Sequence, residues 1–132
     1  MLMTTDFKYN TATESRIDKI NLEDLPFGSV FSDHQFRMDY RDGSWQQGEF
    51  APYGDMSLSP AAMALHYGQA IFEGLKAYKT PDNKIQLFRA RDNFKRMNRS
   101  AKGLCIPELD IDLVMDALKQ LVKLEEHWIP ET

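Results

Sequence analysis

Polar and apolar residues alternate from Phe36 to Tyr40, and this period of two is typical of a half-buried β-strand. The pair Asp42-Gly43 follows directly. Glycine tolerates the positive φ that a tight hairpin turn demands, so the pair predicts a turn. We therefore expect a return strand over residues 44–53, interrupted by Gly48 and Pro52.

A second hairpin is predicted around the polar loop Pro81-Asp82-Asn83. The segments on either side, residues 72–79 and 84–88, would be its two strands. The first of them mixes apolar and charged residues on both faces, so its pattern is weaker than that of the first hairpin.

Three stretches predict helices. The first begins at Ser59-Pro60, with Ser59 as the N-cap and proline in the first helical position, and it ends at Gly68. The second covers residues 91–104 and the third covers residues 110–126. The third has the clearest pattern, because its apolar residues recur at helical spacing on one stripe. That stripe consists of Ile111, Val114, Met115, Leu118, Leu121 and Val122.

The order of these elements predicts an α+β fold in which an antiparallel sheet packs against helices. Residues 1–28 are polar and poorly patterned, which indicates an irregular lead-in. Residues 29–132 would then form an incomplete small α/β domain. The predicted strands are short and need further partners or cover, so we expect the chain to be truncated.

Composition narrows the class of protein. The single cysteine cannot form an internal disulfide, and with only three histidines the chain offers no zinc framework. The longest apolar run, residues 61–65, falls far short of the roughly 20 residues of a membrane span. The N-terminus has no apolar core of a secretory signal. We expect a cytoplasmic protein that binds neither a membrane nor a metal.

Positive charge is concentrated in one predicted helix. Residues 89–102 hold six basic residues against a single acidic one, a net charge of +5. Since the whole chain carries −4, the remaining residues carry −9. Most of the six would form a solvated face, but an arginine near the helix start could grip an anion with its planar fork of donors. The six are Arg89, Arg91, Lys95, Arg96, Arg99 and Lys102.

A nucleic-acid-binding module that uses this basic helix is the alternative of another class. The charge of −9 on the rest of the chain disfavours it. The aromatic residue within this range, Phe94, lies opposite the basic side chains on the predicted helix, so the basic face itself lacks the aromatic platforms that single strands require. A stand-alone interaction domain is a further alternative that we rank below truncation.

Residues 65–74 place two aromatic side chains and two glycines between a helix and a strand. Spacing alone favours Tyr67 and Phe72 as core residues. His66 has no second histidine four residues later, so a metal site there is not expected. The usual nucleotide-binding and hydrolase motifs are absent. The residues by themselves support an α+β domain with one anion-binding helix.

Several linked blocks resemble the N-terminal part of branched-chain amino-acid aminotransferases, which are fold-type IV enzymes that use pyridoxal 5′-phosphate (PLP). Together the blocks cover nearly all of residues 20–130. One departure is Ala90, where that family commonly has proline. The blocks are residues 31–34, 38–43, 57–78 and 87–101.

The resemblance implies specific roles. Arg96 stands where the family anchors the PLP phosphate, and Phe31, Tyr67 and Phe72 stand where it lines the substrate side-chain pocket. The reaction would move an amino group between leucine, isoleucine or valine and 2-oxoglutarate, in a homodimer. The lysine that forms the Schiff base with PLP would lie in a large domain beyond Thr132. No catalytic residue is therefore expected within these residues, which by themselves should be inactive.

Other fold-type IV enzymes are the alternatives within the same class, namely a D-amino-acid aminotransferase or an aminodeoxychorismate lyase. The block that contains Phe31 and the length of chain before Ala61 favour the branched-chain group. Lys76 and Lys95 are not candidates for the Schiff-base lysine. The resemblance places Lys76 on a strand at the edge of the site, and Lys95 lies among other cations on the basic helix.

Overall fold

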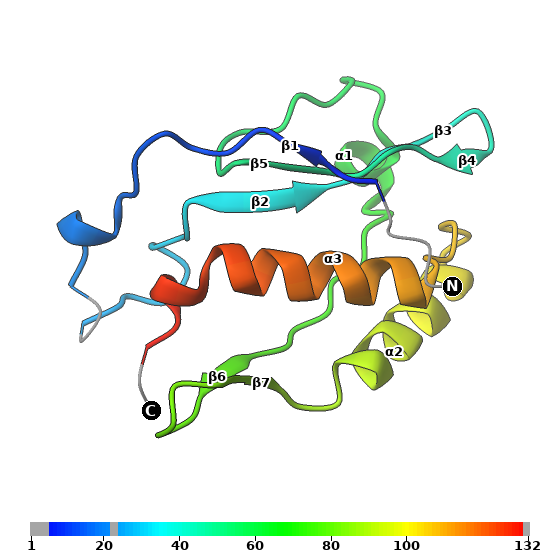
Figure 1. Ribbon diagram of the computed structural model, residues 1–132. Helices are drawn as coiled ribbons and strands as arrows, with labels where there is room; N and C mark the ends of the chain where they lie inside the picture. The colour runs from blue at the N-terminus through cyan, green and yellow to red at the C-terminus, as the bar shows by residue number, and fades with distance from the viewer. Residues whose placement is uncertain (1–5, 22–23, 131–132) are drawn as a thin grey trace.

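The computed structural model describes residues 6–21 and 24–130. These residues form a mixed α/β arrangement of small, mostly antiparallel sheets and helices (Figure 1). The strands are β1 (Lys8–Tyr9), β2 (His34–Arg37), β3 (Tyr40–Arg41), β4 (Ser44–Trp45), β5 (Glu49–Pro52), β6 (Ala77–Lys79) and β7 (Ile85–Leu87). The α-helices are α1 (Met63–Tyr67), α2 (Ala90–Gly103) and α3 (Ile111–Leu124), and short 3₁₀ helices cover Ile17–Lys19 and Glu126–Trp128.

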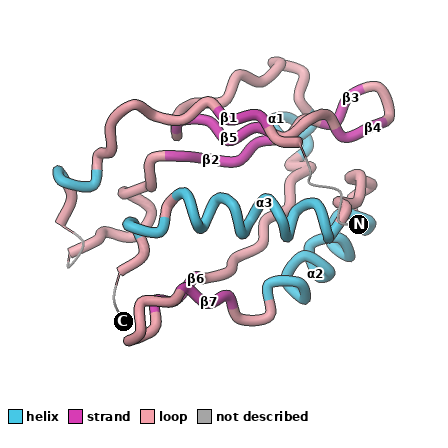
Figure 2. Tube along the Cα trace, in the orientation of Figure 1, coloured by secondary structure: helices cyan, strands magenta, loops and turns pink. Residues whose placement is uncertain are grey.

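Helix α3 runs through the middle of the molecule, with the sheet β1-β5-β2 on one side and the β6–β7 hairpin and α2 on the other (Figures 1 and 2). The expected antiparallel sheet is thus divided, within the described residues, into three small sheets. Strands β2 and β5 pair antiparallel, with Phe36 opposite Phe50, while β1 adds to β5 in parallel.

Residues 1–28, predicted to be an irregular lead-in, contain a short strand in their first described part. Strand β1 pairs with β5, and Phe7 beside it is 6% exposed within the core. The sequence pattern missed this strand because two residues are too few to show an alternation. Residues 1–5 and 22–23 of the predicted lead-in, and 131–132 of the predicted domain, lie outside the described residues.

The Asp42-Gly43 turn is confirmed. It joins β3 to β4, and both residues have positive φ, +52° for Asp42 and +77° for Gly43. The expected return strand is split into β4 and β5, with the break at residues 46–48. At the break, Gly48 lies so close to the Phe36 ring that an added Cβ would come within 2.3 Å of it.

The second predicted hairpin is also confirmed, but its first strand is shorter than expected. Strand β6 begins at Ala77, and residues 72–76 are not a strand. These residues bond to α2 instead of to a strand partner. Asn93 Nδ2 donates a 2.8 Å hydrogen bond to the carbonyl oxygen of Gly74.

Helix α1 ends at Gly68 as predicted, since this glycine has the left-handed φ of +60° that stops a helix. Its start differs from the prediction, because the helix begins at Met63 and Ser59 is not its N-cap. Ser59 and Pro60 instead form a turn, in which Ser59 Oγ accepts a 3.2 Å hydrogen bond from the backbone of Ala61. After the helix, Gln69 donates a 2.7 Å bond to the carbonyl of Leu104 and so ties this segment to the end of α2.

Helices α2 and α3 occupy the predicted ranges to within two residues. The start of α3 is capped by Asp110, whose Oδ1 accepts from the backbone N–H groups of Asp112 at 2.8 Å and Leu113 at 3.2 Å. No helix in residues 6–21 and 24–130 combines the length and apolar character needed to cross a bilayer.

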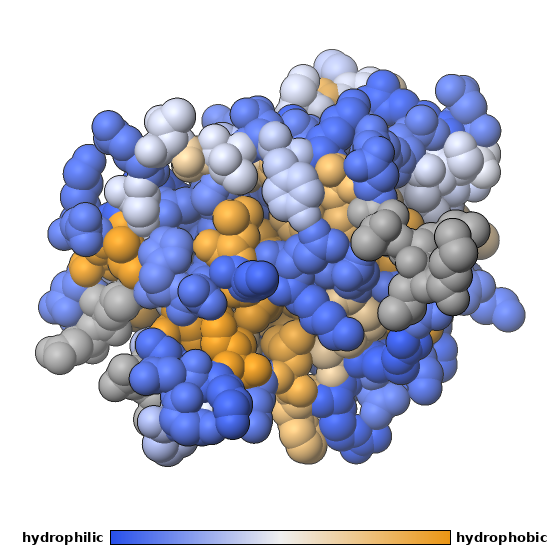
Figure 3. Space-filling model, viewed as in Figure 1, coloured by the Kyte–Doolittle hydropathy of each residue, from blue (hydrophilic) through white to orange (hydrophobic). Residues whose placement is uncertain are grey.

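The core lies between α3 and the β1-β5-β2 sheet. Phe50, Phe7 and Ala117 are buried there. The ring of Phe7 packs edge-on against that of Phe50, with their centroids 5.6 Å apart. Partly buried side chains that complete the core are Phe36, Leu113, Leu121 and Leu124. Figure 3 shows further apolar side chains at the molecular surface around α3.

A buried polar cluster holds the end of α3 against the start of β2. Asp33 is 4% exposed and Glu125 is 5% exposed. Glu125 Oε2 accepts a 2.8 Å hydrogen bond from the backbone N–H of Asp33, and its other oxygen pairs with Nδ1 of His34. Asp33 in turn accepts from Ser15 Oγ at 2.5 Å, from the backbone of Arg16 at 2.9 Å and from Trp128 Nε1 at 2.9 Å. Both buried carboxylates therefore have the hydrogen-bond donors that offset the free-energy cost of removing them from water.

Candidate functional site

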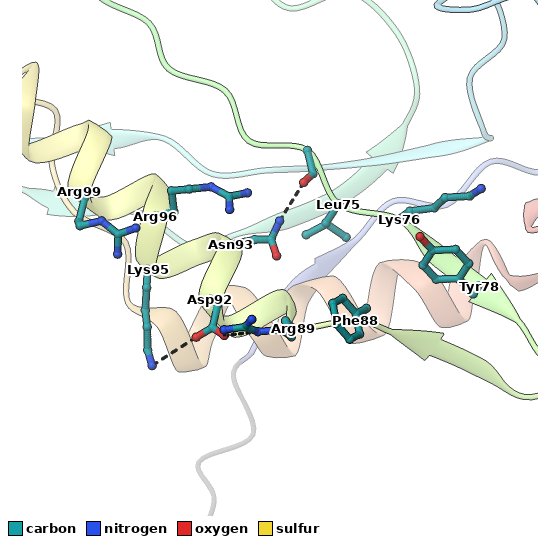
Figure 4. A pocket seen from close by; sticks show the side chains of 11 residues that line it. Leu75, Lys76, Tyr78, Phe88, Arg89, Asp92, Asn93, Lys95, Arg96 and Arg99 are labelled. Carbon is teal, nitrogen blue, oxygen red and sulfur yellow. Dashed lines mark hydrogen bonds and ion pairs between the residues drawn. The ribbon is translucent and has the colours of Figure 1, made fainter.

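A cavity of about 830 Å³ lies between the first half of α2 and the segment that leads into β6. Five basic side chains line it against one acidic side chain, which makes it an electropositive hollow. Figure 4 shows the side chains of α2 on one side of this space and those of Leu75, Lys76 and Tyr78 on the other. The charged lining residues are Lys76, Arg89, Asp92, Lys95, Arg96 and Arg99.

The basic side chains of the cavity differ in whether they already contact a partner within the protein. Asp92 pairs with Arg89 at 2.8 Å and with Lys95 at 3.6 Å, and these contacts lower the pKa of its carboxyl, with the Arg89 hydrogen bond as the largest cause. The Lys76 ammonium lies 5.1 Å from the centre of the Tyr78 ring. Arg99 has no ion-pair partner within the described residues.

Arg96 makes the most defined contact of the site. Its Nε donates a 2.7 Å hydrogen bond to Oε2 of Glu73, and its Nη2 donates to Oε1 of the same carboxylate. Asn93 Nδ2 donates to that carboxylate as well, at 3.3 Å. The pKa of Glu73 is lowered, chiefly by the Arg96 hydrogen bond, and the pKa of Arg96 is raised by the same contact.

The start of α2 sets the direction in which these side chains emerge. Arg89 precedes the helix in a left-handed conformation with a φ of +52°, so the chain turns sharply from β7 into α2. Ala90 stands where the similar family commonly has proline, and α2 nevertheless begins at this residue. Ala90 is the first helical residue and is 5% exposed, so its small side chain is packed inside.

The three aromatic residues expected in a substrate pocket lie outside the lining of this cavity. Tyr67 is 79% exposed and Phe72 is 93% exposed. The prediction from spacing that these two are core residues is therefore wrong. Phe31 is 46% exposed and stacks on Tyr53, with the ring centroids 4.5 Å apart.

Glu73 and Asn93 are residues of the site that sequence reasoning missed. Both stand inside the blocks that carry the resemblance, but Glu73 lies outside the basic segment 89–102. Glu73 and Arg96 are 23 positions apart and on different elements, so no local spacing rule connects them. The nearest signal was that Glu73 directly precedes Gly74 in an unusual glycine-containing stretch.

Comparison with known proteins found relatives over most of the chain. "Branched-chain-amino-acid transaminase 1" of Bacillus subtilis (strain 168) is 47% identical over 115 residues, which are 86% of this chain and 32% of the relative. "Branched-chain-amino-acid aminotransferase 2" of the same organism is 46% identical over 119 residues, or 89% of this chain and 33% of the relative. The chain is similar to branched-chain aminotransferases.

More distant relatives agree with this similarity. The "branched-chain-amino-acid aminotransferase" of Mycolicibacterium smegmatis (strain ATCC 700084 / mc(2)155) is 41% identical over 128 residues, which are 96% of this chain and 34% of the relative. The chain thus spans about a third of the length of the curated relatives it matches. A scan against models of protein families finds no match. The resemblance recognised in the sequence is confirmed.

Proposed function

We propose that these residues are part of a PLP-dependent aminotransferase that moves an amino group between branched-chain L-amino acids and 2-oxoglutarate. The observation that carries the proposal is the similarity to branched-chain aminotransferases at 41–47% identity over 86–96% of the chain. We assign the described residues to the small domain of the fold-type IV architecture. The mixed α/β arrangement is compatible with that assignment.

The chemistry of the cavity fits the phosphate of PLP. A phosphate needs several donors and positive charge, and the cavity supplies five basic side chains. Arg96 is the proposed anchor, since its guanidinium can present two parallel N–H groups to one phosphate. Among the described residues, no cluster of His, Cys, Asp and Glu side chains could hold a metal ion.

When bound, PLP supplies the electron-withdrawing ring on which amino-acid chemistry takes place. The residues of this chain contribute binding and orientation. Arg96 would hold the phosphate end of PLP in place. Phe31, Tyr67 and Phe72 would line the pocket for the substrate side chain. Aromatic walls suit branched aliphatic groups, which have no polar atoms to satisfy.

The test uses the full-length protein that carries this sequence. It should transfer the amino group of leucine, isoleucine or valine to 2-oxoglutarate, measured as glutamate formed. Arg96→Ala should weaken PLP binding by about tenfold or more, because a charge-assisted hydrogen bond is lost. Arg91→Ala is the matched control, since Arg91 lies on the same helix, pairs with Asp112 and does not line the cavity.

Two outcomes would overturn this proposal. A full-length protein that uses D-amino acids, or releases products of a lyase, would place it with the other fold-type IV enzymes. Equal PLP affinity of the Arg96→Ala and Arg91→Ala proteins would remove Arg96 from the phosphate site. The comparisons do not favour these alternatives, because the relatives described above are named for branched-chain amino acids.

Further parts of the proposal concern the whole protein. We propose that the lysine that holds PLP lies outside these 132 residues, so that they show no transaminase activity when expressed alone. We also propose a homodimer in the cytoplasm. Light scattering of the full-length protein tests the dimer, and an activity assay on residues 1–132 tests the inactivity.

The nucleic-acid alternative makes a different prediction. The cations of α2 are partly neutralised by Asp92, Glu73 and Asp112 in ion pairs. A nucleic-acid-binding face would keep such cations available to phosphates along a strand. Tight, salt-dependent binding of random DNA at physiological salt would support that alternative over the aminotransferase.

A further inference from the structure

The contact between Glu73 and Arg96 uses only one edge of the guanidinium group. An arginine has five N–H donors in a flat fork. Glu73 accepts from Nε and from Nη2, which is the side edge of that fork. Within the described residues, Arg96 has no other hydrogen-bond or ion-pair partner. Its end edge, formed by Nη1 and the second hydrogen of Nη2, is therefore open to a further acceptor.

The carboxylate is the more firmly held member of the pair. The Glu73 side chain is 11% exposed, whereas that of Arg96 is 57% exposed. Glu73 also receives hydrogen bonds from Asn93 at 3.3 Å and from the backbone N–H of Gly74 at 3.1 Å. The same Asn93 amide donates to the Gly74 carbonyl, which fixes the loop that carries Glu73 to α2. A held carboxylate thus grips a guanidinium that would otherwise move in solvent.

Arg96 borders the cavity while Glu73 does not line it. In Figure 4 the Arg96 side chain extends from α2 towards the segment at Leu75. Glu73 therefore approaches the guanidinium from outside the cavity lining. This arrangement leaves the end edge of the fork available for an anion in the hollow.

We propose that Glu73 is a positioning residue that holds the Arg96 guanidinium for the phosphate of PLP. The inference rests on the proposed function, and it assigns Glu73 no contact with PLP. A free arginine side chain loses its rotamer freedom when it binds a ligand, and this loss weakens binding. A guanidinium already fixed by Glu73 avoids that loss, so the phosphate binds more tightly.

A positioning role and a purely electrostatic role of Glu73 predict opposite changes in PLP affinity when Glu73 is removed, which makes the inference testable. Glu73 places a negative charge near the cavity. If only this charge mattered, its removal would strengthen the binding of an anion. If its grip on Arg96 matters more, removal of the side chain weakens binding. Glu73→Gln separates the two effects, because it removes the charge but keeps one oxygen that accepts from Arg96.

The experiment measures the dissociation constants of PLP and of pyridoxal, which lacks the phosphate, for the full-length apoprotein. Glu73→Ala should raise the constant for PLP by about three- to tenfold. It should leave the constant for pyridoxal unchanged, and Glu73→Gln should lie between wild type and Glu73→Ala. Asp92→Asn is the charge control, because Asp92 lines the cavity without touching Arg96, and asparagine keeps an oxygen that accepts from Arg89. This control should tighten PLP binding.

The failures of the two proposals can be distinguished. If Arg96→Ala does not weaken PLP binding, the phosphate site itself is misassigned. If Arg96→Ala weakens it but Glu73→Ala does not, only the positioning role is wrong. Tighter PLP binding by Glu73→Ala would also contradict the inference. A double variant supplies the last check, since Glu73→Ala should no longer weaken PLP binding in the Arg96→Ala background.

Discussion

The indole Nε1 of Trp128 donates a 2.9 Å hydrogen bond to Oδ2 of Asp33, a residue 95 positions earlier in the chain. The Asp33 side chain is 3% exposed, and Ser15 and Arg16 donate to the same carboxylate. Three segments that are far apart in the sequence thus meet at one buried charge. A buried carboxylate is stable only when its lone pairs find donors, so this meeting point stabilises the fold.

Asp33→Asn should destabilise the protein. The amide places an NH₂ group where the carboxylate accepts hydrogen bonds, so at least one buried donor loses its acceptor, at a cost of about 1–3 kcal/mol. The free energy of unfolding in urea measures the loss. Asp55→Asn is the control, because it makes the same substitution at an exposed aspartate. Equal stability of the two variants would contradict the role of the cluster.

The stability of the protein should also depend on Asp33 at acidic pH. Burial raises the pKa of Asp33, but hydrogen bonds from Ser15, Arg16 and Trp128 outweigh it and lower the pKa far below the usual range. An unfolded aspartate has a pKa of about 3.9, so the folded state binds the proton less tightly than the unfolded state. The stabilisation is therefore complete above about pH 4 and is lost as the pH falls through the folded pKa.

The measurement is the urea midpoint of wild type and Asp33→Asn between neutral and strongly acidic pH. The difference between the two proteins should be constant near pH 7 and should shrink below about pH 4. A difference that grows on acidification would show that the carboxylate is not held in its charged form.

Gly48→Ala should destabilise the protein through overpacking. An added Cβ would meet the Phe36 ring at 2.3 Å and the Phe7 ring at 3.1 Å. Both rings pack in the core, so they cannot retreat into solvent, and we expect a loss of about 1–3 kcal/mol. Gly54→Ala is the matched control, because nothing lies within 4 Å of its added Cβ. Thermal unfolding should separate the two variants by several degrees.

Asp110→Ala should weaken helix α3. The side chain of Asp110 accepts two backbone hydrogen bonds at the start of this helix, and loss of such a cap costs about 0.5–2 kcal/mol. Asp110→Ser should recover most of the loss, since serine also caps. Urea unfolding compares the three proteins. Equal losses with alanine and serine would indicate that the charge of Asp110, and not its cap, matters.

The sequence predicted those parts of the fold that depend on neighbouring residues. Asp42-Gly43 marks its hairpin because both residues must adopt positive φ, and Gly68 marks the end of α1 for the same reason. The start of α1 was missed because Ser59 satisfies its hydrogen bonds in a turn that needs no helix. Strand β1 was missed because only its pairing with β5 makes it a strand.

In the candidate site, too, the sequence indicated the local features but not the tertiary contacts. The concentration of cations on α2 is visible in the sequence, and the resemblance selected Arg96 from among them. The pairing of Arg96 with Glu73 is a tertiary contact between a helix and a loop, so no periodicity could indicate it. The roles of Phe31, Tyr67 and Phe72 stay predictions, because these exposed rings line no part of the cavity at Arg96.

The hydrogen bond from Gln69 to Leu104 has a practical consequence for experiments on the site. Cys105 follows Leu104, is exposed and is the sole thiol of the chain. A fluorophore attached there would need no engineered position within these 132 residues. Gln69 anchors the segment that carries Tyr67 to Leu104, next to this cysteine. The dye would therefore report when Tyr67 and its neighbours detach from the end of α2.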